Sequence, residues 1–370
     1  MILHVIDTLN RGGAERVLVD LVTALSPLVD GRIGTCTTRA PGDLVRELPM
    51  AVRHFSIERE QRWDFRALRR FRRFVRAEGV TLVHAHSRST LAFVAAALAG
   101  RQARPRIVMH DHFGRLALEP DASRSYRWLV HRFVDHYITV SEELHQWAMS
   151  RLGMPADRCT MINNGVPMSR FQTMSRNAGT HSSEQLSALF VANLRPEKNH
   201  FALVRAIAMS TMLRRMLHVQ LVGSGADGAL GQEVAALIRK LEVGRNVTLY
   251  GASDRVDELL AAADFGIVAS RSEAGPVVAL EYMAAGLPYV STPVGNIFET
   301  AGAHRCCIVA EGRRAEDLAA ALERMCALSE GERSAMGTRA RALVDQRYSV
   351  EQQAAMVAAL YTSLRRNAAA

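Results

Sequence analysis

The chain is poor in cysteine and almost without lysine. Its five cysteines are scattered along 370 residues and none belongs to a C-x-x-C pair. An odd number of dispersed cysteines argues against a disulfide framework or a cysteine-based metal site, so we interpret them as reduced thiols. Arginine supplies 44 of the 46 basic side chains. A lysine therefore suggests a position where a compact ammonium is required.

Long apolar runs are also missing. The longest, Leu91–Ala99, is far shorter than the ~20 residues that a membrane-spanning helix needs. The N-terminus reads as a strand rather than as a charged and then apolar signal segment. With 48% apolar residues, a chain of this length can form two domains, each with its own core. We therefore expect a globular, cytoplasmic protein of two domains.

Positive charge is concentrated in the first half. Residues 1–180 hold 26 basic and 17 acidic side chains, whereas residues 181–370 hold 20 of each. Much of the excess lies in two stretches that also contain aromatic residues, Arg62–Arg76 and Arg124–Arg132. Such stretches predict either helices that lie on an anionic membrane surface or core-packed helices with a solvated arginine face. They contain no known nucleic-acid-reading motif, so we expect no nucleic acid partner.

Strand and helix patterns alternate along the chain. Apolar strand patterns occur at residues 1–7, 81–84, 106–110, 137–140, 186–191, 218–223, 247–250, 265–268, 289–291 and 307–309. Amphipathic helical patterns between them predict parallel sheets covered by helices on both faces. A polar segment without periodicity, residues 171–185, predicts a linker between domains 1–170 and 186–350. A last helix is expected over Glu351–Arg366.

Two carboxylates seven residues apart bracket a predicted helix start near the C-terminal end. Glu273 precedes Gly275 and Pro276, and Glu281 lies within the apolar run that follows. Gly275 permits close backbone approach, and Pro276 suits the first helical position, so free N–H groups would face an anion. If the segment were largely helical, the carboxylates would lie about 12 Å apart at ~1.5 Å per residue. A diphosphate between a sugar and a ribose would offer hydroxyls to both.

This arrangement resembles the Glu-seven-Glu motif of retaining nucleotide-sugar glycosyltransferases with the GT-B fold, especially family 4. Further similarities run along essentially the whole chain: the loop from Arg11 to Arg16 with Gly12 and Gly13, the turn Asn163–Val166, the segment Val191–Asn199, the strand end Val222–Gly225, and the segment Pro293–Glu299. The resemblance implies two Rossmann-like domains that face each other across a cleft, with the C-terminal helix, residues 351–370, packing on the N-terminal domain.

The segment after residue 191 departs from the family pattern at one position. The resemblance implies that Lys198 holds the donor diphosphate together with an arginine, but Asn193 stands at the arginine position. Arg195 could supply the second cation, or the helix N-terminus could carry more of the phosphate charge. His110 ends a strand, and in the family a histidine there approaches the reacting sugar and the acceptor. His84, His86, Asp111 and His112 are nearby, but no spacing matches a zinc motif, so we expect no metal.

On this resemblance we predict a retaining glycosyltransferase of bacterial-type surface polysaccharide or lipopolysaccharide synthesis. It would move a sugar from a nucleotide diphosphate donor to a hydroxyl of a glycan or lipid-linked acceptor, without a cofactor. Its expected catalytic residues are His110, Glu273 and Lys198. Its expected donor-binding residues are Gly12, Gly13, Asn193, Arg195, Lys198, Gly223, Glu273, Ala274, Gly275, Pro276, Val277 and Glu281. The alternatives are a nucleotide-sugar epimerase, a glycogen-synthase-like polymerase, for which the chain is short, and a catalytically silent scaffold that binds glycan or a partner.

Overall fold

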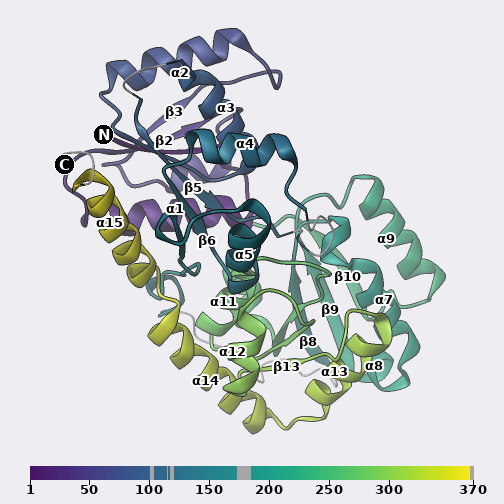
Figure 1. Cartoon of the computed structure of the whole chain (residues 1–370). Coiled ribbons are helices and arrows are strands. Elements are labelled where there is room, and N and C mark those ends of the chain that lie inside the picture. The colour runs from purple at the N-terminus through teal and green to yellow at the C-terminus, as the bar shows by residue number, and fades with distance from the viewer. Residues whose placement is uncertain (101–103, 115, 117–120, 173–184, 367–370) are drawn as a thin grey trace. The chain divides into compact units, whose positions relative to one another are not determined.

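The chain folds into two compact units, each built around one parallel sheet (Figure 1). The computed structural model describes residues 1–100, 104–114, 116, 121–172 and 185–366. The first unit comprises Met1–Gly165 and the C-terminal segment from Val350, and the second comprises Val166–Ser349. The units thus meet in sequence at Gly165 and Val166 rather than at residue 170. Most of the expected linker, residues 173–184, lies outside the described residues.

The first unit has seven parallel strands in the order β3-β2-β1-β4-β5-β6-β7. Its strands are β1 (Ile2–Ile6), β2 (Ile33–Thr37), β3 (Arg53–Ser56), β4 (Leu82–Ala85), β5 (Arg106–Asp111), β6 (His136–Thr139) and β7 (Cys159–Met161). Its helices are α1 (Gly13–Leu25), α2 (Phe65–Ala77), α3 (Arg88–Leu98), α4 (Arg124–Phe133), α5 (Glu142–Trp147) and α15 (Val350–Arg366).

The C-terminal helix α15 packs beside α1 on one face of this sheet (Figure 1). Ala354, Val357 and Tyr361 of α15 are buried in the same apolar cluster as Ile2 and Ile6 of β1. Side chains alternate between the two faces of a strand, so residues two apart share a face. His4, between Ile2 and Ile6, therefore faces the side that α1 and α15 cover.

The second unit has six parallel strands in the order β10-β9-β8-β11-β12-β13. Its strands are β8 (Leu186–Val191), β9 (Leu217–Val222), β10 (Val247–Gly251), β11 (Phe265–Val268), β12 (Tyr289–Ser291) and β13 (Cys307–Val309). Its helices are α6 (Ser169–Gln172), α7 (His200–Met209), α8 (Thr211–Met216), α9 (Ala229–Lys240), α10 (Val256–Ala262), α11 (Val277–Ala284), α12 (Ile297–Ala303), α13 (Ala315–Ala327) and α14 (Glu330–Arg347).

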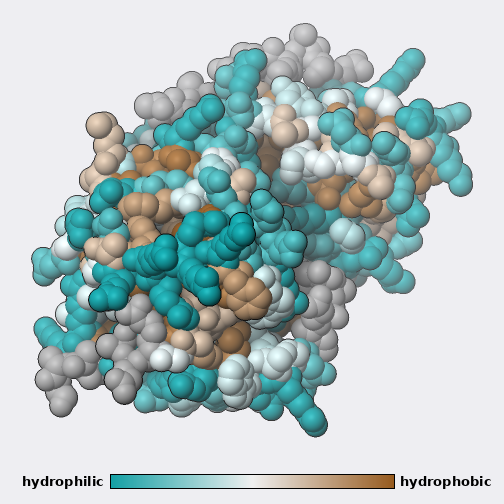
Figure 2. All heavy atoms as spheres, turned by 90° about the horizontal axis from the view of Figure 1, so that it is seen from above, coloured by the Kyte–Doolittle hydropathy of each residue, from teal (hydrophilic) through white to brown (hydrophobic). Residues whose placement is uncertain are grey.

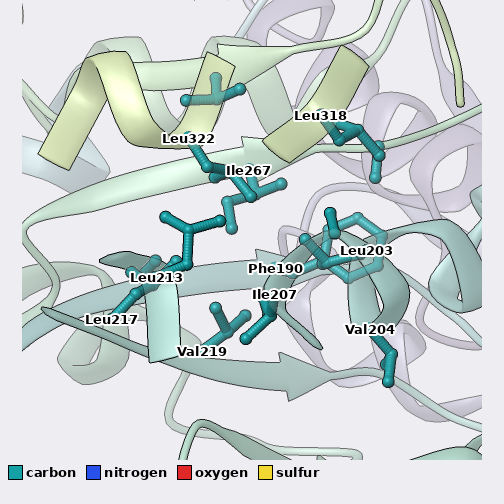
Figure 3. Close-up of a cluster of buried hydrophobic side chains, with 14 of the residues drawn as sticks. Phe190, Leu203, Val204, Ile207, Leu213, Leu217, Val219, Ile267, Leu318 and Leu322 are labelled. Atoms are coloured by element: carbon teal, nitrogen blue, oxygen red, sulfur yellow. The ribbon is translucent and has the colours of Figure 1, made fainter. Parts of the chain in front are cut away.

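Both faces of the second sheet are buried. Phe190 of β8 packs with side chains of α7, α8 and α13 (Figure 3), whereas the adjacent Leu189 belongs to a separate cluster that includes α11. Alternate residues of one strand thus enter two cores, as expected for a parallel sheet covered on both sides. The prediction of two doubly wound, Rossmann-like domains is confirmed by the two sheets. No helix among the described residues is long and apolar enough to cross a membrane.

Candidate functional site

The predicted donor residues gather at the point where the strand order of the second sheet reverses. β8 and β11 are neighbours there, although β9 and β10 separate them in sequence. The loop after β8 carries Asn193, Arg195 and Lys198, and the loop after β11 carries Glu273. In open α/β sheets, ligands bind beyond the carboxyl ends of the strands at such a switch point. The topology therefore brings together motifs that lie about 75 residues apart in sequence.

Three contacts tie the two loops to each other. The Arg271 backbone N–H donates to the Glu197 carbonyl (2.7 Å), and the Arg271 Nε donates to the Asn199 Oδ1 (3.1 Å). The Lys198 ammonium forms an ion pair with the Glu273 Oε1, and both side chains are largely buried, with 24% and 12% of their surface exposed. The two residues predicted from separate motifs thus meet in one site.

Glu273 has a second fixed partner. The Ser270 hydroxyl donates to the same Oε1 of Glu273 at 2.7 Å. Oε1 therefore accepts from both Lys198 and Ser270, which holds the carboxylate in one orientation. The sequence analysis predicted no role for Ser270. A hydroxyl three residues before the glutamate is the signal that could have suggested one.

Glu281 is held by an arginine that the sequence analysis did not single out. Arg170 on α6 donates from Nη1 to the Glu281 Oε1 (3.0 Å) and from Nη2 to the Asp257 Oδ1 (2.7 Å). The three residues lie on α6, α10 and α11. No local pattern marks Arg170 in a chain with 44 arginines, because only the tertiary fold brings it to Glu281.

The helix between the two glutamates is shorter than the helical segment considered from the sequence. α11 begins at Val277, and Pro276 is the residue before it rather than its first residue. Proline fixes its own φ and cannot donate a hydrogen bond, which suits it to either of these neighbouring positions. Ala274 is buried, and the loop packs so closely on Gly295 that a Cβ there would lie 2.7 Å from the Pro276 Cδ. The ~12 Å helical spacing therefore does not apply to Glu273, which precedes the helix.

Asn193 joins the loop after β8 to the glycine loop after β9. Its Oδ1 accepts from the Ser224 backbone N–H (3.0 Å), and the Leu194 N–H donates to the Ser224 carbonyl (2.8 Å). Gly223 lies against this loop, since a Cβ there would be 2.1 Å from the Ala192 carbonyl oxygen. Arg195 is exposed, and its guanidinium has no hydrogen bond or ion pair with another residue that the structure describes.

The glycine pair of the first unit lies at the start of α1. Gly12 is the extended residue before the helix, and Gly13 is its first residue. The preceding loop is fixed by two backbone hydrogen bonds, from Leu9 N–H to the Pro41 carbonyl and from Leu44 N–H to the Leu9 carbonyl, both 2.9 Å. The loop thus follows β1, where the strand order of the first sheet reverses between β1 and β4.

His110 is fully buried at the end of β5, among other histidines of the first unit. Its ring centroid lies 4.2 Å from that of His112, 5.2 Å from that of His84 and 5.3 Å from that of His86. Neither ring nitrogen has a hydrogen-bond partner among the described residues. Burial, together with the neighbouring histidines, holds the pKa of His110 well below its usual value, so its ring is neutral at pH 7.

Known protein families match both units of the chain. Residues 11–170 match the model of Glycosyltransferase Family 4, and residues 171–343 match that of Glycosyl transferases group 1. The chain belongs to the glycosyltransferases. Bacillus subtilis (strain 168) has a relative named "Putative glycosyltransferase EpsF", and the two are 26% identical over 313 residues, or 78% of each chain.

Solved glycosyltransferase structures share the fold. Anabaena Alr3699/HepE, crystallised with UDP and glucose, aligns with a TM-score of 0.80 at 20% identity over 98% of this chain and 99% of HepE. WaaG, described as a glycosyltransferase involved in lipopolysaccharide biosynthesis, aligns with a TM-score of 0.73 at 17% identity over 96% of this chain and 99% of WaaG. The two parallel-sheet domains of this glycosyltransferase are therefore those of the GT-B fold.

Proposed function

We propose that this glycosyltransferase moves a hexose from a nucleotide diphosphate sugar to a hydroxyl of a glycan or lipid-linked acceptor, with retention of the anomeric configuration, in the synthesis of a bacterial surface polysaccharide. The observation that carries the proposal is the meeting of Lys198 and Glu273 at the switch point of the second sheet, before the N-terminus of α11. A cation and free N–H groups suit a diphosphate, and a carboxylate suits sugar hydroxyls.

Each residue receives a role that its surroundings support. Lys198 neutralises the β-phosphate and is available to do so if the diphosphate oxygens take over part of its contact with Glu273. Glu273, oriented by Ser270, accepts hydrogen bonds from the donor sugar's hydroxyls. Glu281, whose carboxylate Arg170 holds, accepts hydrogen bonds from the ribose hydroxyls. Lys198 and the helix end stabilise the departing phosphate electrostatically, so donor binding requires no metal.

In this proposal, sugar transfer depends on the positioning of donor and acceptor and does not involve a covalent enzyme intermediate. None of these side chains is an obvious nucleophile, so we propose that the acceptor attacks on the face from which the diphosphate departs. Catalysis then consists of orienting the donor and stabilising charge on the leaving phosphate. The predicted approach of His110 to the reacting sugar stays a prediction. Its ring has no exposed surface, so such an approach would require neighbouring side chains to move.

Incubation with a panel of nucleotide sugars tests the proposal. UDP-glucose is the first donor to try, because HepE, a structural relative, was crystallised with it. We expect slow release of the nucleoside diphosphate from one donor, since an enzyme poised for transfer also passes the sugar to water. Release of no nucleotide from any donor would instead favour a catalytically silent scaffold, which the asparagine at position 193 makes worth testing. Conversion of the sugar without release would indicate an epimerase.

We also propose that the first unit docks on an anionic membrane surface, where a lipid-linked acceptor is found. In α2, Phe71 and Val75 are buried, whereas Phe65 is 74% exposed, and Trp63 just before the helix is 55% exposed. Trp128 of α4 is 63% exposed. On α2, Arg66 directly follows Phe65 and Arg69 lies about one turn later, and both arginines are exposed. Seen from the side on which α2 lies, hydrophilic side chains border exposed hydrophobic ones (Figure 2).

The protein should pellet with anionic vesicles at low salt and detach at high salt. Each arginine near the surface contributes ~1 kcal/mol, and the attraction fades within a Debye length. The double variant Arg66→Glu/Arg69→Glu should bind much more weakly, while Arg239→Glu, an exposed change on α9 of the second unit, should bind as the parent does. If the parent protein stays in the supernatant even at low salt, these arginines form only a solvated face.

A further inference from the structure

Five histidines, four of them buried, lie together in the first unit on one face of three neighbouring strands. His4 of β1 pairs in register with His84 of β4, and His110 is the penultimate residue of β5. His86 and His112 follow two residues after His84 and His110, so their side chains continue on the same face. Less than a tenth of the surface of His4, His84, His86 and His110 is exposed, whereas His112 is partly exposed. Burying this many imidazoles in one core costs folding free energy unless their ring nitrogens have partners.

One chain of hydrogen bonds links His86, His4, Tyr361 and His84. The His86 Nε2 lies 3.0 Å from the His4 Nδ1, and the His4 Nε2 lies 3.1 Å from the Tyr361 hydroxyl on α15. That hydroxyl also lies 2.5 Å from the His84 Nδ1. If His86 donates from Nε2, His4 donates in turn to Tyr361 and Tyr361 donates to His84. In this arrangement the Nδ1 of His86 keeps a free lone pair.

That lone pair points into a second group of nitrogens. The His86 Nδ1 lies 3.4 Å from the His112 Nε2, and neither nitrogen of His110 has a partner among the described residues. One nitrogen from each of the three rings lies within 4.8 Å of the others. Two nitrogens that each lie ~2.0–2.1 Å from a tetrahedral zinc ion are about 3.4 Å apart. The separation between His86 and His112 thus already equals the edge of such a site.

We propose that His86, His110 and His112 bind a divalent transition metal ion, with zinc as the best fit to three imidazoles. The hydrogen bonds from His86 through His4 and Tyr361 to His84 would hold the His86 ring in the ligating orientation. The fourth position would belong to water, because His112 is partly exposed and offers a route of entry. This site lies in the first unit, whereas Lys198, Glu273 and Glu281 belong to the second. It departs from the sequence-based expectation of no metal.

The neighbouring groups favour this triad over the other possible ones. His4, His84 and His86 are also close enough to hold an ion, but Tyr361 already occupies a nitrogen of His4 and one of His84. Asp111 is not available as a fourth ligand. Its carboxylate accepts from Arg88 (3.0 Å), from the Tyr137 hydroxyl (2.5 Å) and from the Phe113 backbone N–H (3.0 Å).

Metal analysis and cobalt titration of the tag-free, full-length protein test the proposal. We expect about one zinc ion per chain after purification without chelators, or uptake of one equivalent when stripped protein is titrated with zinc. Cobalt(II) should give the visible absorption of a tetrahedral site. His112→Gln should bind either ion at least about tenfold more weakly. His54→Gln, a change at a half-buried histidine bonded to Thr35 on a neighbouring strand, should bind as the parent does.

Tyr361→Phe separates a metal site from a simple cluster of neutral histidines. Loss of the hydroxyl leaves the three ligands in place but breaks the chain behind His86, so affinity for cobalt should fall by about 10- to 100-fold. Circular dichroism checks that each variant is folded. Stripped parent protein that takes up neither zinc nor cobalt more tightly than His112→Gln does would overturn the proposal. None of these readouts depends on sugar transfer, so the test stands apart from that of the proposed function.

Discussion

Lys198→Ala and Glu273→Ala should each lower turnover with the complete donor by about tenfold or more. Each change removes a charge-assisted hydrogen bond worth roughly 1.5–3 kcal/mol, and 1.4 kcal/mol corresponds to a factor of ten. Glu281→Ala should instead mainly weaken binding of the nucleoside diphosphate, because its proposed partner is the ribose. Steady-state kinetics and calorimetric titration with the diphosphate distinguish the two effects.

The ion pair between Lys198 and Glu273 adds a second expectation. Because the two side chains contact each other, the double variant should lose less than the product of the two single losses. Lys240→Ala is the matched control, since it removes the only other lysine of the chain at an exposed position on α9. Turnover and diphosphate binding that stay at parent levels in Lys198→Ala, Glu273→Ala and Glu281→Ala would refute the assignment of the donor site.

Arg195→Ala tests whether Arg195 supplies the cation that the family pattern places at the position of Asn193. The Arg195 guanidinium is exposed three residues before Lys198, whereas Asn193 is bonded to the Ser224 backbone. If Arg195 supplies the second cation, its loss should impair turnover nearly as much as the loss of Lys198. Unchanged turnover would mean that Lys198 and the N-terminus of α11 suffice.

Gly223→Ala should disrupt the donor site through the backbone rather than through charge. The added Cβ would lie 2.1 Å from the Ala192 carbonyl oxygen and 2.8 Å from the Asn193 nitrogen, so one of the two loops must move. Overpacking of this kind typically costs 1–3 kcal/mol. In a protein with domains of this size we expect a melting temperature several degrees lower and diphosphate affinity reduced by about tenfold or more.

Gly244→Ala is the control for that experiment. A Cβ at Gly244 would meet no atom within 4 Å, although the residue lies in the same unit. Thermal unfolding and calorimetric titration with the diphosphate should therefore leave Gly244→Ala at parent values. The argument fails if Gly223→Ala binds the diphosphate as tightly as Gly244→Ala does.

The strands that could be predicted from sequence are those with continuous apolar runs. All six strands of the second unit and four of the first follow such runs or, as in β9 and β10, an alternation of apolar and polar residues. The other three, β2, β3 and β7, were not predicted. β3 (Arg53–Ser56) and β7 (Cys159–Met161) are short edge strands, and β2 is rich in small and polar residues although it is buried. Their pairing depends on the neighbouring strands rather than on a local pattern.

The residues of the candidate site likewise fall into those that could be predicted from sequence and those that could not. Lys198, Glu273 and Glu281 could be predicted because each belongs to a short motif placed next to a strand or helix end. Arg170 and Asp257 could not, because they meet Glu281 only through the packing of α6, α10 and α11. The bond from Ser224 to Asn193 likewise joins loops 31 residues apart. Contacts of this kind depend on tertiary packing, which cannot be predicted from local sequence periodicity.

The anomeric configuration of the sugar released from the donor tests the central claim most directly. Proton NMR during the first turnovers of donor incubation shows which anomer forms before mutarotation mixes the two. A retaining glycosyltransferase that binds its donor at Lys198 and Glu273 should release the nucleoside diphosphate together with the sugar in the donor's own configuration, and Lys198→Ala should slow that release about tenfold or more. Release of the opposite anomer, or release that Lys198→Ala leaves unchanged, would contradict the account.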